Sequence, residues 1–384
     1  MMPMRNDPAG DKGVVRWARN LAAAGLLIFL LAGLGTTLRD VLQHRLDVFP
    51  EPVTWSSFLT GRTTANVARA MASAPVPVAA ARLQRGISWE LLADLGPHVR
   101  TGCPGWLFIA DELRVHPQRA KDLSARADVL ARVHEALRAR GIALLVVTVP
   151  DKSRIEASRL CGLARPTALD DRLRQWNELL LEHGIAHLDF QATLRDAQQR
   201  SGQPMFLRTD THWNEAAAEA AAQTTAAAVR AQGVRPVPEQ HWQVYRQAEQ
   251  LGDLIRLAGL DRWQAKRPLQ ADHVQASHFK PVDADEAAPD DQELFGDADA
   301  PNIALIGTSF SNTSNFGRFL EQHLQVRLGR FAKDGGDFDG AAKAYFASDA
   351  FRQNPPRLLI WEVPERVLQL PDAHDHLSKL LKND

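Results

Sequence analysis

The sequence lacks the features that mark several common classes of protein. Its 384 residues include only two cysteines, and its formal net charge is −1. Two cysteines are too few for a structural zinc site, and a balanced charge gives no basic surface for nucleic acid. There is also no G-x-G-x-x-G loop, no P-loop, no H-E-x-x-H pair and no internal repeat. We therefore expect no metal, no cofactor and no nucleic-acid partner.

Charge is also missing from one long stretch near the N-terminus. No charged residue occurs from Leu21 to Gly35, and residues 36–38 extend this run to 18 positions, close to the lower limit for a membrane span of roughly 17–25 residues. Four cations precede the run: Arg5, Lys12, Arg16 and Arg19. The positive-inside rule then leaves the N-terminus in the cytoplasm and exports everything after about residue 39. This predicts a single-pass inner-membrane protein with its main domain in the periplasm.

A cleaved signal peptide is the competing interpretation of the same run, because LLAGLG offers small residues. However, no clean A-x-A site follows, and the run is long for a signal core. A buried helix of a soluble protein fits poorly, since the stretch is apolar on all sides. An uncleaved anchor is the interpretation that we favour.

Export changes the interpretation of Cys103 and Cys161. An even pair of cysteines in an oxidising compartment favours a disulfide. Such a bridge would close a loop of about 59 residues, worth roughly 4 kcal/mol in the chain-entropy model. The alternative is two separately buried thiols.

Helix and strand patterns alternate along most of the exported part. Apolar residues at helical spacing, often ending in glycine, are followed by short apolar runs typical of strands covered on both faces. Helices are expected at 124–141, 168–184, 215–233 and 314–324, and strands at 142–150, 185–190, 302–307, 326–330 and 357–363. This predicts an α/β/α sandwich around a mainly parallel sheet, in which ligands bind at the carboxyl ends of the strands.

The chain is accordingly divided into three parts. Residues 1–39 are expected to form a cytoplasmic tip and transmembrane anchor, 40–100 a helical periplasmic connector, and 101–384 the globular domain. Within that domain, 234–300 looks like a long irregular insertion, and its segment 283–299 holds eight acids and no base. That acidic run lacks the spacing of an EF-hand, so we interpret it as a solvated loop.

The motif RTDTHWN at 208–214 is typical of a catalytic base. Asp210 and His212 are spaced so that the carboxylate can hold the imidazole in one tautomer and leave its other nitrogen free. The helix expected to follow, with Asn214 as its cap, places His212 on the turn that enters a helix. A metal site or a merely packed histidine are the alternatives.

A matching nucleophile follows the strand at 302–307. Gly307 allows a tight turn, and Ser309 would then project near the N-terminus of the next helix, where backbone N–H groups can bind an oxyanion. A serine there is usually just a helix cap. Together with Asp210 and His212, however, it completes the residue types of a nucleophile–base–carboxylate triad.

With these motifs in place, the chain resembles the SGNH-like domain of bacterial polysaccharide O-acetyltransferases, the AlgJ and AlgX family. The likeness is carried from about residue 102 to 368 by GWLFIADE, VVTVPDKSRIE, FLRTDTHWN, GTSFSNTSNF and DGGDFDGAAKAYFASDAFRQNPPRLLIWEVPER. The resemblance implies that Asp210, His212 and Ser309 are the catalytic residues. Ordinary SGNH hydrolases place serine first and carry GDS where this chain has Gly307, Thr308 and Ser309, so the family looks permuted relative to them.

Several other residues carry open alternatives. Asn315 is a candidate third oxyanion donor or a helix-turn residue, and Trp213 either walls a sugar site or packs in the core. Asp151 and Lys152 follow a strand end, where an ion pair that fixes the turn is favoured over a substrate role. Two further pairs are expected to be structural: Glu362 with Arg366, and His187 with Asp189.

The function implied by the resemblance is transfer of acetyl groups to hydroxyls of an exported polysaccharide through an acetyl-serine. A membrane-bound O-acyltransferase would supply the acetyl group. An acetyl-polysaccharide esterase with the same residues is the first alternative, and a non-catalytic polysaccharide-binding partner is the second. Alginate, a cellulose-like chain or another glycan all fit as the polymer.

Overall fold

The computed structural model describes residues 8–50, 52–234, 242–248, 252–261, 263, 272, 275–282, 301–371 and 377. The chain divides into two compact units. Unit 1 comprises Met1–Asp94 with Arg262–Lys266, and unit 2 comprises Leu95–Asp261 with Arg267–Asp384. The motifs of the candidate site all belong to unit 2.

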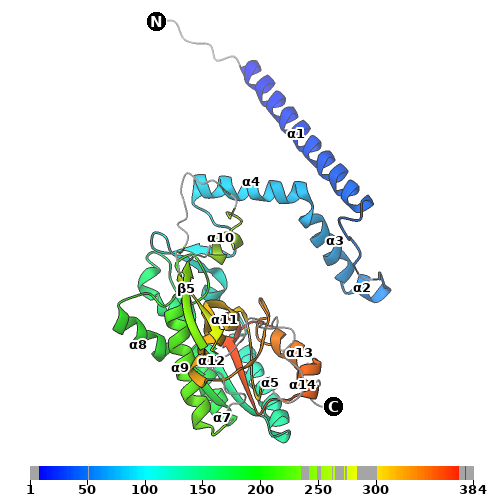
Figure 1. Cartoon of the computed structure of the whole chain (residues 1–384). Coiled ribbons are helices and arrows are strands. Elements are labelled where there is room, and N and C mark those ends of the chain that lie inside the picture. Colours follow the sequence, from blue (N-terminus) through cyan, green and yellow to red (C-terminus); the bar gives the residue numbers. More distant parts are fainter. Residues whose placement is uncertain are drawn as a thin grey trace. The chain divides into compact units, whose positions relative to one another are not determined.

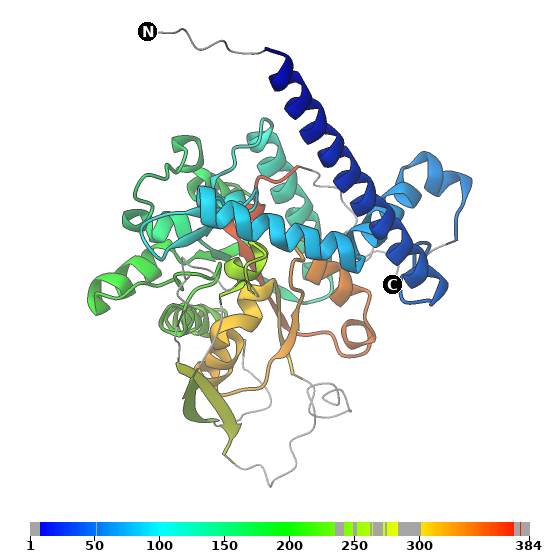
Figure 2. The same ribbon diagram turned by 90° about the horizontal axis from the view of Figure 1, so that it is seen from above.

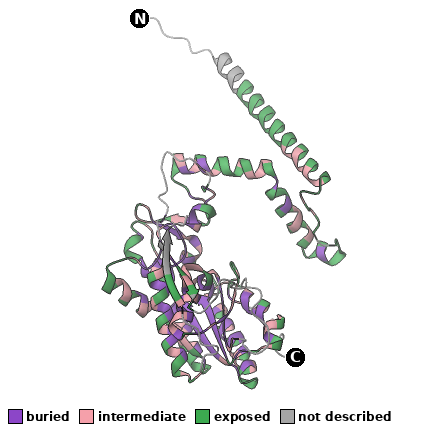
Figure 3. Ribbon diagram, viewed as in Figure 1, coloured by how far each residue is buried: buried purple, intermediate pink, exposed green. Residues whose placement is uncertain are grey.

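Unit 1 is helical in its described residues. Its helices are α1 (Pro8–Leu42), α2 (Trp55–Leu59), α3 (Arg62–Ser73) and α4 (Pro75–Leu92). In α1 the segment Arg16–Leu42 contains an 18-residue window with a mean hydropathy of 2.1 and no buried residue, and Figure 3 shows most of this segment as exposed. One N-terminal helix is therefore long and apolar enough to cross a membrane, as the apolar run predicts.

A five-stranded sheet forms the centre of unit 2, with strand order β4-β3-β9-β7-β8. All its neighbouring strands are parallel. The strands are β3 (Ala143–Val149), β4 (Ala186–Asp189), β7 (Ile303–Gly307), β8 (Gly329–Ala332) and β9 (Leu358–Pro364). The three central strands are buried almost throughout (Figure 3), because helices cover both faces of a parallel sheet.

Alternate strand residues pack against different helices. One hydrophobic cluster joins the sheet to α5 (Arg119–Ala139), α7 (Arg172–Glu182), α13 (Gly340–Phe346) and α14 (Asp349–Gln353). A second cluster joins the other face to α8 (Gln191–Ser201), α9 (Glu215–Ala231) and α12 (Phe316–Leu324). The predicted α/β/α sandwich is confirmed (Figure 1).

Shorter elements complete unit 2. They are β1 (Val99–Thr101), β2 (Leu107–Ile109), η1 (Ala110–Leu113), α6 (Lys152–Ile155), η2 (Ala157–Arg159), η3 (Thr167–Leu169), β5 (Trp242–Ala248), α10 (Asp253–Leu257), β6 (Gln275–Pro281), α11 (Ser309–Asn312), η5 (Thr313–Asn315) and η6 (Glu365–Val367). The pair β1–β2 is antiparallel, as is the pair β5–β6, which Figure 2 shows as two olive arrows.

The structure differs from the sequence predictions in several places. Helix α5 begins five residues before the predicted 124, and α7 begins four residues after the predicted 168. The insertion 234–300 contains the hairpin β5–β6 and helix α10 and is not irregular in its described residues, while the acidic run 283–299 lies outside them. Helix α8 was not predicted. Strand β8 begins three residues later than the predicted 326, at Gly329, which pairs with Ala304 on β7. Val326 and Leu328 precede the strand and are buried in the cluster that includes α12.

Candidate active site

The strand β7 ends in a turn that presents Ser309 at the carboxyl edge of the sheet. Thr308 caps the short helix α11, and its side-chain oxygen accepts the Phe310 N–H. Gly307 is needed there, because a Cβ atom would collide with Ser311 and Glu362. Ser309 is only half-buried, whereas Thr308 and Phe310 on either side are buried. The turn therefore leaves the Ser309 hydroxyl accessible on a fixed backbone.

The second loop, residues 205–214, is closed by its own backbone. Asn214 N–H donates to the Met205 carbonyl, Leu207 N–H donates to the His212 carbonyl, and the Asn214 side chain caps α9 through the Ala217 N–H. This small closed loop holds Asp210 and His212 at the entry to α9, where the cap was predicted.

Ser309, His212 and Asp210 form one hydrogen-bonded chain. His212 Nε2 lies 2.7 Å from Ser309 Oγ, and His212 Nδ1 lies 2.6 Å from Asp210 Oδ1. With its proton on Nδ1 and donated to Asp210, the imidazole offers Nε2 as an acceptor for the serine hydroxyl. The arrangement is that of a nucleophile, a general base and an orienting carboxylate.

Asp210 remains ionised in this setting. Burial alone would raise its pKa, but the hydrogen bond and charge of His212 outweigh burial and lower the pKa of Asp210 to about 2. Its Oδ1 also accepts the backbone N–H of His212, and its Oδ2 accepts the N–H of Asp253. Both carboxylate oxygens are thus held in place.

Two acids from the insertion hold this loop, and sequence reasoning missed both. Asp253 accepts hydrogen bonds from the N–H and hydroxyl of Thr211, at 2.7 and 2.5 Å. Asp272 accepts the N–H groups of Arg208 and Thr209, at 2.9 and 2.6 Å, and the Thr209 hydroxyl. Neither acid stands in a motif, so no local signal in the sequence could have found them.

Asp253 also adds a second carboxylate beside the imidazole. Its Oδ2 lies 3.7 Å from His212 Nδ1, and burial, followed by the charge of Asp210, raises the pKa of Asp253. Asp210, His212 and Asp253 bring donor atoms within 4.8 Å of one another, a spacing that also fits a metal ion. A metal on Nδ1 would displace the proton that Asp210 accepts.

Lys152 lies beneath the loop as a buried cation. Its ammonium donates to the carbonyls of Leu107, Arg208 and Asp210, at 2.6, 3.0 and 2.9 Å. Asp151 instead pairs with Arg172 and Arg165. The expected ion pair between these neighbours is therefore replaced by two separate networks, and both side chains are buried.

The remaining sequence candidates have structural contacts. Asn315 donates its side-chain N–H groups to Glu215 and to the Ser277 carbonyl, which leaves none for an oxyanion at Ser309. Trp213 is fully buried, with ring centroids 5.1 Å from Phe316 and 5.4 Å from Phe310, so it packs in the core and does not wall a sugar site.

The members of the two pairs expected to be structural make their hydrogen bonds and ring contacts with other residues, so the charged contact expected between Glu362 and Arg366 is not what holds either side chain. His187 Nδ1 contacts the Ile185 carbonyl, and Asp189 accepts from Asn177 and from the Gln191 N–H. Glu362 makes its hydrogen bonds with Thr308 and Ser311, while the Arg366 guanidinium lies 5.2 Å from the Phe310 ring centre.

The predicted disulfide is present. Cys103 and Cys161 are bonded, with their Cα atoms 5.0 Å apart. The Cys103 N–H also donates to the Arg159 carbonyl. The bridge thereby ties the turn between β1 and β2 to the segment that follows α6.

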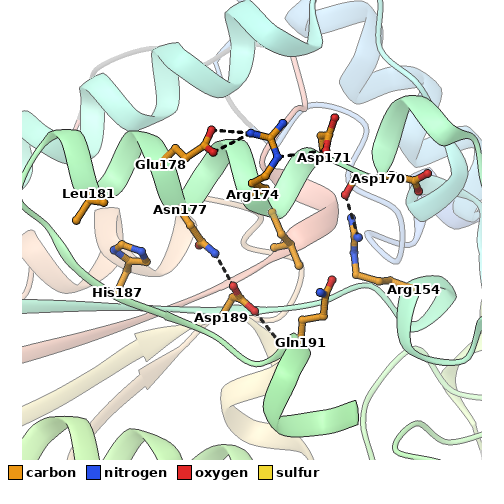
Figure 4. Close-up of a pocket in the computed structure, with 11 residues that line it drawn as sticks. Arg154, Asp170, Asp171, Arg174, Asn177, Glu178, Leu181, His187, Asp189 and Gln191 are labelled. Atoms are coloured by element: carbon orange, nitrogen blue, oxygen red, sulfur yellow. Dashed lines mark hydrogen bonds and ion pairs between the residues drawn. The ribbon is translucent and has the colours of Figure 1, made fainter. Parts of the chain in front are cut away.

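A separate pocket of about 500 Å³ lies along α7 and β4 (Figure 4). No member of the Ser309–His212–Asp210 chain lines it. Arg174 pairs with Asp171 and Glu178 across its rim, and Arg154 donates to the Asp170 carbonyl (Figure 4). Both arginine side chains at the pocket are therefore engaged in contacts within the protein.

Comparison with known proteins adds a family relationship. A sequence model described as "SGNH hydrolase-like domain, acetyltransferase AlgX" matches residues 99–365. The chain is 32% identical over 306 residues to the probable alginate O-acetylase AlgJ of Pseudomonas aeruginosa, covering 77% of each protein. It is 28% identical over 243 residues to the alginate biosynthesis protein AlgX of that organism, covering 61% of this chain and 49% of that protein.

A solved structure shares the fold. The O-acetyltransferase domain of Pseudomonas putida AlgJ superposes with a TM-score of 0.63 at 26% identity, covering 75% of this chain and all of that one. The similarity in sequence and in structure thus extends over most of unit 2.

Proposed function

Because the chain belongs to the AlgX and AlgJ family of SGNH hydrolase-like acetyltransferases, we propose that it transfers acetyl groups to hydroxyls of an exported polysaccharide. The observation that carries the proposal is the hydrogen-bonded chain from Ser309 through His212 to Asp210. It stands at the carboxyl edge of a parallel sheet, where α/β proteins bind their ligands. Alginate, named for the relatives, is the first polymer to test.

The first half of the proposed reaction acetylates Ser309. His212 Nε2 accepts the Ser309 proton as Oγ attacks the acetyl carbonyl carbon of the donor, and the carbonyl oxygen becomes an oxyanion. Backbone N–H groups around Ser309 stabilise that oxyanion. The bond between the carbonyl carbon and the leaving group then breaks. His212 gives the proton taken from Ser309 to the leaving group, and acetyl-Ser309 remains.

The second half transfers the acetyl group to sugar. An acceptor hydroxyl gives its proton to His212 Nε2 and attacks the acetyl carbonyl, and Ser309 leaves and regains the proton from His212. Asp210 keeps the imidazole in the required tautomer and stabilises its charged form, for which the low pKa of Asp210 is suited. The net change moves the acetyl group from the donor to a sugar hydroxyl.

The proposal includes the setting of the reaction. Residues 1–39 would form an N-in anchor, 40–100 a helical connector, and 101–384 the periplasmic acetyltransferase domain. The anchor would keep the domain beside a membrane-bound O-acyltransferase that brings acetyl groups across the membrane. The long exposed apolar helix α1 supports this arrangement.

The deciding experiment offers purified protein an acetyl donor and a panel of oligosaccharides. Ester formed on sugar is measured against acetate released to water, with Ser309→Ala and His212→Ala as controls. Ester formation that both substitutions abolish supports transfer, while acetate release alone would favour the esterase. A folded Ser309→Ala protein that still transfers acetyl would rule out this mechanism and favour a binding role.

A further inference from the structure

A buried carboxylate lies directly under the turn that carries Ser309. Glu362 belongs to β9, the central strand of the sheet, in which every residue is buried. Only 1% of Glu362 is exposed, and burial raises its pKa. A carboxyl group inside a sheet is costly unless its oxygens are fully hydrogen-bonded, so its partners are informative.

Those partners all come from the nucleophile turn. Glu362 Oε2 accepts the Thr308 N–H at 2.6 Å and the Ser311 hydroxyl at 3.0 Å. The Thr308 hydroxyl also donates to both carboxyl oxygens, at 3.1 and 3.0 Å. In turn, Thr308 Oγ1 accepts the Phe310 N–H at 3.3 Å. The carboxylate therefore fixes the residues on both sides of Ser309.

The close approach is built into the backbone. A Cβ atom at Gly307 would collide with the Glu362 side chain and with Ser311 Oγ. Glycine at this position thus lets the strand β7 pass against the carboxylate on β9. Glu362 thereby ties the start of the short helix α11 to the central strand of the sheet.

From these contacts we infer that Glu362 is a positioning residue that sets the place of the Ser309 hydroxyl through Thr308 and Ser311. The inference rests on the proposed role of Ser309 as nucleophile. Ser309 Oγ must stay within hydrogen-bond reach of His212 Nε2, now 2.7 Å away, while it also faces the acetyl carbon. A misplacement of about 1 Å in such a geometry can cost about 10²-fold in rate.

A second buried carboxylate provides a matched control. Glu321 on α12 is 2% exposed, and burial raises its pKa too. Its partners are the Leu328 N–H, Arg318 and Arg330. The change Glu321→Gln is therefore the same substitution at a similarly buried carboxylate, one whose partners lie outside the hydrogen bonds around Ser309.

The experiment compares these two variants of the full-length protein in acetyl-ester turnover. Glu362→Gln replaces one of the two carboxylate oxygens with an amide N–H₂ that cannot accept from the Thr308 and Ser311 donors, and we expect kcat to fall by about 10²-fold with KM changed less than about twofold. A serine-directed sulfonyl fluoride should label Ser309 more slowly by a similar factor. Glu321→Gln should leave kcat and the labelling rate within about twofold of wild type.

Substitutions in the turn test the same contacts from the other side. Thr308→Val and Ser311→Ala each remove one hydroxyl donor, and Thr308→Ser restores it. Lowered kcat in the first two, with recovery in Thr308→Ser and unchanged thermal melting, supports the inference even if Glu362→Gln does not fold. In a double-mutant cycle, Thr308→Val should cost little once Glu362→Gln is present.

Two outcomes separate the claims. If Ser309→Ala abolishes turnover but Thr308→Val, Ser311→Ala and folded Glu362→Gln keep wild-type kcat and labelling, the positioning role is overturned and the nucleophile stands. If Ser309→Ala itself retains turnover, the proposed mechanism fails first.

Discussion

The Nζ atom of Lys152 lies 2.9 Å from the backbone carbonyl oxygen of Asp210. A buried ammonium thus anchors the loop that carries the carboxylate of the candidate site. Trp106 and Phe108 surround this cation, with ring centres 5.3 and 5.1 Å from Nζ. Burial disfavours the charged ammonium and lowers the pKa of Lys152 to about 8. The negative charges of Glu112, Asp272, Asp210 and Asp253 oppose this effect but do not cancel it.

We predict an alkaline pH dependence of stability from Lys152. Because its pKa is lower in the folded chain than the ordinary value of about 10.4, the unfolded chain binds more protons between about pH 8 and 10. The free energy of unfolding should therefore rise with pH across that window, by up to about 3 kcal/mol from this group. This rise is measured by urea unfolding of wild type and of Lys152→Met, each at pH 7.5 and at pH 10. The contribution of Lys152 is the rise in wild type minus the rise in the variant.

In Lys152→Met the rise should be absent, and the turnover of acetyl esters should fall because the Asp210 carbonyl loses its donor. Equal pH slopes in the two proteins would contradict the assignment to Lys152.

Asp210 predicts a rise of stability with pH in the same direction, but in the acid range. Its folded pKa of about 2 lies below the ordinary value, so its contribution to stability is complete above about pH 4 and is lost as pH falls toward 2. The loss should be about 2 kcal/mol. In Asp210→Asn the difference from wild type should shrink between pH 5 and pH 2.5 as measured by urea unfolding; a constant difference would argue against an ionised Asp210.

The disulfide should stabilise unit 2 substantially. Cys103 and Cys161 are 58 positions apart, and the chain-entropy model gives roughly 4 kcal/mol for a loop of that size. Replacing both with serine should lower the urea midpoint without preventing folding at low temperature. Reductant should shift the midpoint of wild type in the same direction and leave the double variant unchanged. If reductant leaves the urea midpoint of wild type unchanged, the disulfide does not stabilise the protein as predicted.

The apolar helix α1 should stay attached to the mature protein. The cations before residue 20 and the exposed segment Arg16–Leu42 predict an unprocessed N-in anchor. N-terminal sequencing of protein from membranes should find residues before Leu21. A mature N-terminus after residue 30 would instead indicate a cleaved signal peptide, and release of the protein by carbonate washing would exclude a spanning anchor.

The sequence could indicate the fold because its signals are local. Strands such as β3 and β9 are continuous apolar runs, and helix α9 carries its cap Asn214 beside it. These patterns depend only on residues a few positions apart. The structure of the insertion around Asp253 and Asp272 could not be predicted in the same way. These residues are held by contacts to loop 205–214, which is distant in sequence, and no local pattern indicates such contacts.

The sequence by itself determined the alternation of helix and strand, the apolar N-terminal run, and the residue types of a serine, a histidine and an aspartate at strand and helix ends. Only the tertiary structure decided which groups meet. Ser309 and His212 are 97 positions apart in the chain but form a hydrogen bond. Trp213 packs in the core, and Asn315 donates to Glu215. Glu362 accepts hydrogen bonds from the turn around Ser309. Such contacts join residues far apart in sequence, and their geometry depends on how the whole sheet and its helices pack.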